Sequence, residues 1–251
     1  MPERTADLRA DDGSRLAALW RTPEGGGPYP CVACVHGLTL DKSIFDGFVR
    51  VLEAAGLASL RVDLRGHGGS GGRLEDQGFL DQGNDVRAAF EAMALQPGAD
   101  PARRGLLGFS MGGALGALAA FRLRPRALAL WSPLLKTGPW DEARGRDFGP
   151  PQGGLRTIWD GIRVHERLFS EAQALDPFGA ALAWEGPLLL CHGAKDRNHP
   201  QRYSLELASA RARLARPATT YFPPLSGHAW KPESERAQRD ILSAEFFRDT
   251  L

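Results

Sequence analysis

The sequence predicts an α/β protein with a mostly parallel sheet that is covered by helices on both faces. Short apolar runs alternate with segments of helical periodicity, which is the pattern of parallel strands joined by crossover helices. The chain has 251 residues, enough for one large domain with its own core, and no internal repeat divides it. We therefore expect one sheet in one domain.

The sequence opens with a predicted hairpin, and six buried strands follow it. Residues 5–21 favour two antiparallel strands around a turn at Asp12-Gly13. The later strand candidates are "CVACVH" (31–36), "ASLRVDL" (58–64), "RGLLGF" (104–109), "ALALWS" (127–132), "PLLLCH" (187–192) and "TTYFP" (219–223). Between them the sequence predicts helices at about 43–55, 82–95, 111–122, 202–215 and 233–249.

One segment, residues 134–184, interrupts this alternation. It is too long for a simple connection and too irregular for a single helix. Disordered segments contain few aromatic residues, so its large apolar side chains favour a folded cap. These side chains are Trp140, Phe148, Ile158, Trp159, Leu168, Phe169 and Trp184. We therefore expect a core of residues 1–133 and 185–251 and a small cap at 134–184.

The charge pattern argues against nucleic-acid and membrane partners. The 31 basic and 30 acidic residues are spread along the chain, and the formal net charge is +1. The N-terminus lacks the pattern of a signal peptide, and the longest apolar stretch, around 114–121, is far shorter than the ~20 residues of a membrane span. We expect a cytoplasmic protein that acts on a small molecule, and its oligomeric state stays open.

The three cysteines all lie in apolar runs. Cys31 and Cys34 have C-x-x-C spacing, but residues i and i+3 of a strand point to opposite faces of the sheet. A metal-binding or redox pair is therefore disfavoured. We expect all three cysteines, including Cys191, to be small buried apolar residues.

A serine stands where a predicted strand meets a predicted helix, in the stretch "LLGFSMGG" at 106–113. Gly108 and Gly112 flank Ser110 with the G-x-S-x-G spacing of a tight turn that exposes the serine hydroxyl. An ordinary strand-to-helix turn, with small residues for packing, could have the same spacing. The rest of the chain must distinguish the two interpretations.

A nucleophilic serine needs a base to take its proton and a third group to orient that base. His228 lies in "FPPLSGHAW", between the last predicted strand and the last helix. Asp196 lies in "LLLCHGAKDRNHP", after the preceding strand. Both loops follow strands at the carboxyl end of the sheet, where Ser110 also lies. We therefore expect Ser110, Asp196 and His228 to be catalytic, with Asp63 as an alternative acid.

Five stretches together resemble the α/β-hydrolase superfamily, in which nucleophile, acid and histidine follow in this order. They are "VHGLTLDKSIFDGFVRVLEAAG", "RVDLRGHGGSGG", "LLGFSMGG", "LLLCHGAKD" and "SGHAW". The resemblance covers nearly the whole chain and implies a mostly parallel eight-stranded sheet with a small cap. The first two stretches are similar to small carboxylesterases of the cinnamoyl/feruloyl esterase and serine aminopeptidase-like group.

The resemblance also implies an oxyanion hole and a substrate pocket. The backbone N–H groups of Leu38 and Met111 would stabilise the negative charge that grows on the carbonyl oxygen during attack. We expect Trp140 and Trp159 of the cap to form an apolar wall for the substrate. The alternative is that both tryptophans pack inside the cap.

Other polar residues receive structural interpretations. We expect His36 to hold its loop by hydrogen bonds, Asp63 and Arg65 to stabilise a turn, and His67 to be a surface or loop-packing residue. His192 and His199 flank Asp196, but no third ligand has a suitable spacing, so no metal is expected. No cofactor is expected either, because a serine triad needs none.

Three functions follow from these residues. The first is a serine carboxylesterase that cleaves small or medium acyl esters through an acyl-enzyme on Ser110. The second uses the same triad on amide, thioester or C–C bonds, or for perhydrolysis, because the pocket and not the triad selects the bond. The third is a non-catalytic pseudo-hydrolase that binds a ligand. Dehalogenase and epoxide-hydrolase chemistry is disfavoured, since those relatives have aspartate at position 110.

Overall fold

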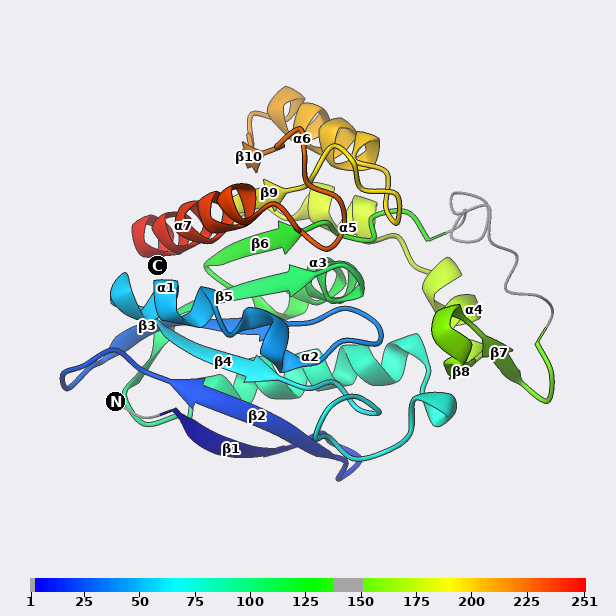
Figure 1. The fold of residues 1–251 in the computed structure, drawn as a ribbon. Helices are drawn as coiled ribbons and strands as arrows, with labels where there is room; N and C mark the ends of the chain where they lie inside the picture. Colours follow the sequence, from blue (N-terminus) through cyan, green and yellow to red (C-terminus); the bar gives the residue numbers. More distant parts are fainter. Residues whose placement is uncertain (1–2, 138–150) are drawn as a thin grey trace.

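The computed structural model describes residues 3–137 and 151–251, and its main feature is one twisted sheet (Figure 1). Eight strands of the described ranges form this sheet in the order β1-β2-β4-β3-β5-β6-β9-β10. β1, β2 and β4 pair antiparallel, and all pairs from β4 to β10 are parallel. The strands are β1 (Arg4–Arg9), β2 (Arg15–Arg21), β3 (Tyr29–Val35), β4 (Ala58–Val62), β5 (Ala99–Phe109), β6 (Ala127–Trp131), β9 (Leu188–Cys191) and β10 (Thr219–Tyr221). The predicted fold class is confirmed.

Helices cover both faces of the sheet. Phe48 and Phe247 of α1 and α7 belong to one hydrophobic cluster, and Phe79 and Leu115 of α2 and α3 belong to the other. The helix bounds are α1 (Phe48–Ala54), α2 (Phe79–Met93), α3 (Met111–Leu123), α6 (Arg202–Arg213) and α7 (Glu233–Thr250). Among the described residues, no helix has the length and apolar character needed to cross a membrane.

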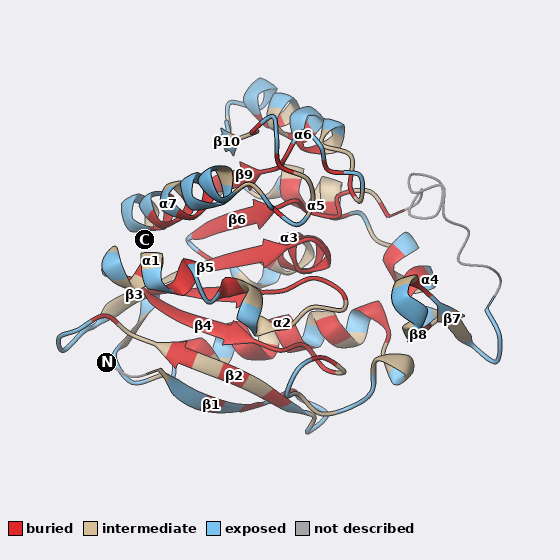
Figure 2. Cartoon of the chain, viewed as in Figure 1, coloured by how far each residue is buried: buried red, intermediate tan, exposed pale blue. Residues whose placement is uncertain are grey.

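The central strands are buried on both sides, as Figure 2 shows by their red colour. Cys31 and Cys34 of β3 lie in different hydrophobic clusters and therefore on opposite faces of the sheet. Both thiols are free and buried, as predicted, and so is Cys191. Burial raises the pKa of Cys34 to about 12, so that this thiol stays uncharged at neutral pH.

Two predicted helices differ from the observed ones at their beginnings. The helix predicted at 43–55 is a 3₁₀ turn, η1 (Lys42–Phe45), followed by α1, and Asp46 at the break pairs with Arg61 of β4. The helix predicted to begin at 82 begins at Phe79. Its N-cap, Gly78, has no side chain to signal a helix start; instead the backbone N–H of Gly78 donates to Asp81 at 2.8 Å.

The predicted cap segment 134–184 is folded in its described part. It holds a short hairpin of β7 (Leu155–Thr157) and β8 (Arg163–His165), η3 (Trp159–Gly161), α4 (Arg167–Gln173) and α5 (Pro177–Ala183). α4 contacts α2, whereas α5 packs against α3 and α6 of the core. Ile158, Leu168 and Phe169 are buried. The division into a core and a separate cap stays a prediction, and Trp140 and Phe148 lie outside the described residues.

The turn between β5 and α3 is packed so tightly that its glycines admit no side chain. A Cβ on Gly108 would lie 2.2 Å from the backbone oxygen of Gly112, and a Cβ on Gly112 would lie 2.3 Å from that of Val35 in β3. Because backbone atoms cannot rotate away as a side chain can, either substitution must displace the turn. The glycines of the G-x-S-x-G motif thus let α3 approach β3 directly.

Replacing Gly112 by alanine is expected to destabilise the fold by roughly 2–4 kcal/mol, because the new methyl group forces backbone apart. Gly116→Ala is the matched control: it lies on the same helix, but its Cβ would meet Leu106 at an ordinary 3.6 Å. There alanine gains helix propensity and should stabilise by up to about 1 kcal/mol. Urea unfolding of both variants measures the difference, and equal effects would contradict the close-packing account.

Candidate active site

Ser110 lies between the end of β5 and the first residue of α3, in a strained backbone conformation. Its φ is 58° and its ψ is −118°, which is unfavourable for a residue with a Cβ and costs on the order of 1–3 kcal/mol. The neighbouring strand holds this conformation, since the Ser110 N–H donates to the carbonyl of Trp131 at 2.9 Å. The turn exposes the hydroxyl to a cavity above the carboxyl end of the sheet.

His228 and Asp196 reach Ser110 from two other loops. His228 follows β10 and Asp196 follows β9, so both come from the carboxyl end of the sheet. The His228 Nε2 is 3.0 Å from the Ser110 Oγ, and the His228 Nδ1 is 2.8 Å from Asp196 Oδ2. The structure therefore brings together the three side chains that the sequence predicts to act together, in a serine–imidazole–carboxylate chain.

The Asp196 carboxylate is buried but stays ionised. Burial alone would raise its pKa, yet hydrogen bonds from His192 and His228 outweigh burial and hold the pKa well below its ordinary value. Asp196 Oδ2 accepts from the two histidines, and Asp196 Oδ1 accepts from the backbone N–H groups of Asn198 at 2.8 Å and His199 at 2.9 Å. An ionised carboxylate only accepts, so the proton of His228 lies on Nδ1 and its Nε2 faces Ser110 as an acceptor.

His192 supports this carboxylate, a role that the sequence analysis missed. Its Nε2 lies 3.2 Å from Asp196 Oδ2 and 2.9 Å from the backbone oxygen of His199, and its Nδ1 is 2.8 Å from the Ser204 hydroxyl. The ring therefore donates from Nε2 and accepts from Ser204. The four-residue spacing between His192 and Asp196 is the sequence signal that could have indicated this contact.

His199 lies directly against Ser110, a contact that the sequence did not predict. Its Nε2 is 3.2 Å from the Ser110 Oγ, and its ring meets the His228 ring edge to face, with centroids 4.9 Å apart. Within residues 3–137 and 151–251, no group of three or more His, Cys, Asp or Glu side chains is placed to hold a metal ion.

A cavity of about 160 Å³ opens at Ser110. Leu38 and Met111, which are predicted to supply the oxyanion-hole N–H groups, both line it. Met111 is the first residue of α3, where a helix leaves backbone N–H groups without partners inside the helix. Leu38 follows Gly37, where a Cβ would lie 2.9 Å from the Ser110 Cβ. The loop after β3 thus passes directly beside Ser110.

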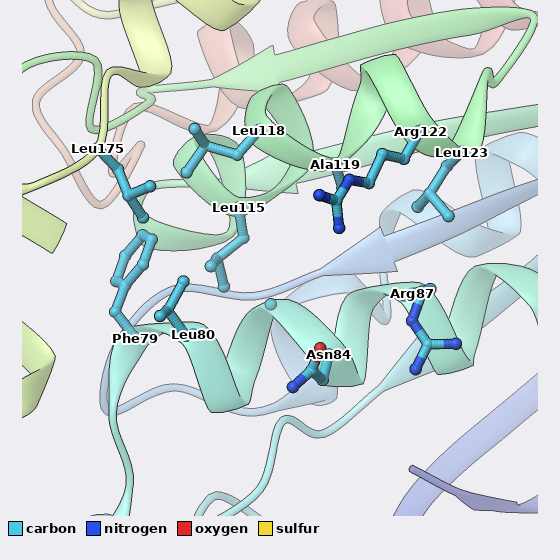
Figure 3. Close-up of a pocket in the computed structure, with 11 residues that line it drawn as sticks. Phe79, Leu80, Asn84, Arg87, Leu115, Leu118, Ala119, Arg122, Leu123 and Leu175 are labelled. Atoms are coloured by element: carbon cyan, nitrogen blue, oxygen red, sulfur yellow. The ribbon is translucent and has the colours of Figure 1, made fainter. Parts of the chain in front are cut away.

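A larger hollow lies elsewhere, between α2 and α3. It has a volume of about 330 Å³ and is lined by residues such as Phe79, Leu118 and Arg87 (Figure 3). Ser110, Asp196 and His228 do not line it. Ser110 and His228 instead line the smaller cavity at the carboxyl end of the sheet.

Two neutral histidines hold the loop after β3. The His36 Nε2 accepts the N–H of Leu64 at 3.0 Å, and the His67 Nε2 accepts the N–H of Thr39 at 3.1 Å. Burial lowers the pKa of His36 to about 3, and burial also lowers the pKa of His67. His36 holds its loop as predicted, and His67 is a buried loop-packing residue rather than a surface one.

Asp63 and Arg65 stabilise neighbouring turns. Asp63 is fully buried and accepts the backbone N–H groups of Lys42 at 2.7 Å and Gly69 at 2.8 Å, and it also pairs with the Lys42 ammonium. Arg65 pairs with buried Asp85. The carboxylate that contacts His228 is that of Asp196, not that of Asp63, the alternative acid.

Trp159 connects the cap segment to the loop after β3. It is partly buried, it lines the cavity at Ser110, and its indole N–H lies 3.4 Å from the Thr39 hydroxyl. Trp140, the other tryptophan predicted to line the pocket, lies outside the described residues.

Acid should weaken the fold through His36. Its pKa is lower in the folded protein than in the unfolded chain, so only the unfolded chain takes up the proton as pH falls from about 6.5 toward 3. His36 therefore does not affect the free energy of unfolding above about pH 6.5. Below that pH it lowers this free energy, by about 2–3 kcal/mol at pH 4.5. His36→Gln can still accept from Leu64 but cannot titrate.

The variant should be less stable than the wild type at pH 7.5, and the gap should shrink as the pH falls to 4.5. Urea unfolding at several pH values measures it. A gap that stays constant over this range would contradict a neutral buried His36.

Comparison with known proteins assigns the chain to a family. Residues 26–155 match the family model described as serine aminopeptidase, S33. Two uncharacterized proteins of Mycobacterium tuberculosis are 35% identical over 130 residues, which are 52% of this chain and 45% of theirs. The chain therefore aligns with less than half the length of these curated relatives.

Solved structures share the fold over the full length. Est1E from Butyrivibrio proteoclasticus, solved with ferulic acid bound, superposes with a TM-score of 0.84 at 21% identity, covering 98% of both chains. The esterase domain of a Rhodothermus marinus protein superposes with a TM-score of 0.76 at 20% identity, covering 99% of both. The family match extends over half of the chain, and the fold extends over all of it. This chain belongs to the serine aminopeptidase S33 family and has the α/β-hydrolase fold.

Proposed function

We propose that this protein is a serine carboxylesterase that cleaves small or medium acyl esters through an acyl-enzyme on Ser110. One observation carries the proposal: Ser110 Oγ, the His228 imidazole and the Asp196 carboxylate form a continuous chain with distances of 3.0 and 2.8 Å. Membership of a hydrolase family and the fold of known esterases support it.

In the first half of the reaction, the Ser110 oxygen attacks the ester carbonyl carbon. Its proton moves to His228 Nε2, and the resulting imidazolium is stabilised by Asp196 at 2.8 Å. The carbonyl oxygen takes up negative charge, which the backbone N–H groups of Leu38 and Met111 would stabilise. When the carbon–oxygen bond to the alcohol breaks, the alcohol leaves with the proton from His228.

In the second half, water replaces the alcohol. His228 Nε2 takes a proton from the water as the water oxygen attacks the acyl carbon, and the same backbone N–H groups stabilise the second oxyanion. The bond between the acyl carbon and Ser110 then breaks, the serine oxygen regains its proton, and the carboxylic acid leaves. The residues end in their starting state.

The cavity at Ser110 suits a short acyl group. Its volume of about 160 Å³ is small, and Leu38, Leu40, Met111 and Trp159 give it apolar walls. Kinetics on p-nitrophenyl esters of increasing acyl length test which acyl length the cavity accepts. A feruloyl ester and an aminoacyl amide, measured beside them, test which type of bond is cleaved. We expect acetyl to hexanoyl esters to be cleaved fastest. Faster amide than ester cleavage would favour the same triad acting as an aminopeptidase.

Ser110→Ala should fold normally and lose nearly all turnover, by on the order of 10⁶ in kcat, because no other group can form the acyl bond. The release of p-nitrophenol from an acetyl ester measures it, and urea unfolding checks the fold. A variant that kept more than a few per cent of the activity would contradict the assignment of Ser110.

Asp196→Asn and Asp63→Asn form a matched pair of buried carboxylate changes. At position 196 the amide no longer fixes the His228 tautomer, and kcat should fall by roughly 10⁴. At position 63 the loss of charge beside Lys42 should lower stability by about 2–4 kcal/mol and leave kcat within about tenfold. Kinetics and urea unfolding of both variants decide, and the reverse pattern would assign the acid role to Asp63.

Trp159→Ala should widen the cavity and remove an apolar contact with the acyl chain. We expect KM for a hexanoyl ester to rise by about 5–10-fold, while kcat for an acetyl ester stays within about twofold. Trp184→Ala is the control, because Trp184 lies in the same predicted cap segment but does not line the cavity. Unchanged substrate ranking together with a lower melting temperature would instead place Trp159 in the packing of the cap.

A further inference from the structure

Two imidazole rings, not one, contact the Ser110 hydroxyl. The Nε2 of His228 is 3.0 Å from the Ser110 Oγ, and the Nε2 of His199 is 3.2 Å from the same atom. His199 is buried, with 5% of its surface exposed, and it lines the cavity beside Leu38 and Met111. A serine–imidazole–carboxylate chain needs only His228, so the second ring requires its own account.

The positions of the Ser110 and His228 protons indicate how the His199 ring interacts with Ser110. Ser110 has one hydroxyl proton. The single N–H proton of the His228 ring lies on Nδ1, where it is donated to the ionised Asp196, so the His228 Nε2 can only accept. The Ser110 proton therefore points to His228. The serine oxygen then keeps lone pairs that can accept, and a hydrogen on the His199 Nε2, 3.2 Å away, would complete a second hydrogen bond.

The backbone of His199 is fixed by the carboxylate that orients His228. Its N–H donates to Asp196 Oδ1 at 2.9 Å, and its carbonyl oxygen accepts from His192 Nε2 at 2.9 Å. Asp196 thus places both rings, and they meet edge to face at 85°. Because the backbone of His199 is fixed, its ring can form a hydrogen bond of fixed direction with the Ser110 oxygen.

We propose that His199 is a second catalytic histidine, whose Nε2–H donates to the Ser110 oxygen and directs the hydroxyl proton toward His228. This inference rests on the proposed serine mechanism. During attack the proton moves from Ser110 to His228 and then to the leaving alcohol, while His199 keeps its own proton throughout. As the serine oxygen gains negative charge, the hydrogen bond from His199 becomes charge-assisted and therefore stronger.

His199→Gln and His199→Met separate this hydrogen bond from packing. Glutamine places an amide N–H as many bonds from the backbone as Nε2, whereas methionine has similar length and no donor. His199→Asn carries the same amide one bond too close to the backbone, and it serves as a second variant should the methionine variant not fold. Urea unfolding checks each fold.

The rate at which a fluorophosphonate probe labels Ser110 reports nucleophile activation without an alcohol or a deacylation step. We expect the methionine and asparagine variants to lose about 10–100-fold both in this rate and in kcat/KM for an acetyl ester. The glutamine variant should stay within about fivefold of the wild type. A methionine variant within twofold of the wild type, or equal losses in the glutamine and methionine variants, would overturn the proposal.

The wild-type protein distinguishes this failure from failure of the proposed function. If the probe does not label Ser110 in the folded wild type, the serine mechanism itself is wrong, and the role of His199 falls with it. If the wild type is labelled and Ser110→Ala is not, the serine mechanism stands. The ratio of the labelling rates of the glutamine and methionine variants then tests the role of His199 alone.

Discussion

The close approach of the Ser110 turn to β3 is the constraint on which the rest of the site depends. Gly112 lies so near the carbonyl of Val35 that no side chain fits between α3 and β3, and a Cβ on Gly37 would lie 2.9 Å from the Ser110 Cβ. This contact holds the serine in an unfavourable backbone conformation and places the Leu38 loop beside it. The strained conformation of Ser110 lowers local stability, and it places the hydroxyl beside the loop that contains Leu38.

Neutral imidazoles connect the loops around this turn. Each ring offers one donor and one acceptor, so a single histidine can join two backbone segments that have no regular pairing. His36 and His67 do this for the loop after β3, and His192 links the backbone of His199 to the Ser204 side chain. Protonation of His36 or His67 would remove the ring nitrogen that accepts, so the position of the loop after β3 depends on both rings staying neutral.

The sequence predicted the sheet and the proximity of three side chains because both leave local signals. Continuous apolar runs mark strands buried on both faces, and chain order with G-x-S-x-G spacing marks Ser110, Asp196 and His228. The contact of His199 with Ser110 leaves no such signal, because it depends on how the loop at 192–200 folds around Asp196. The start of α2 was missed for a related reason, since its N-cap is a glycine.

The central claim is that Ser110 becomes covalently acylated, and trapping that intermediate tests it most directly. The protein is mixed with a slight excess of p-nitrophenyl butyrate, quenched in acid within milliseconds to seconds, and digested for mass spectrometry. The account predicts a burst of p-nitrophenol and a butyryl group on the peptide that contains Ser110. Steady turnover of the ester with no acyl group on Ser110 at any time, or with the acyl group on another residue, would contradict it.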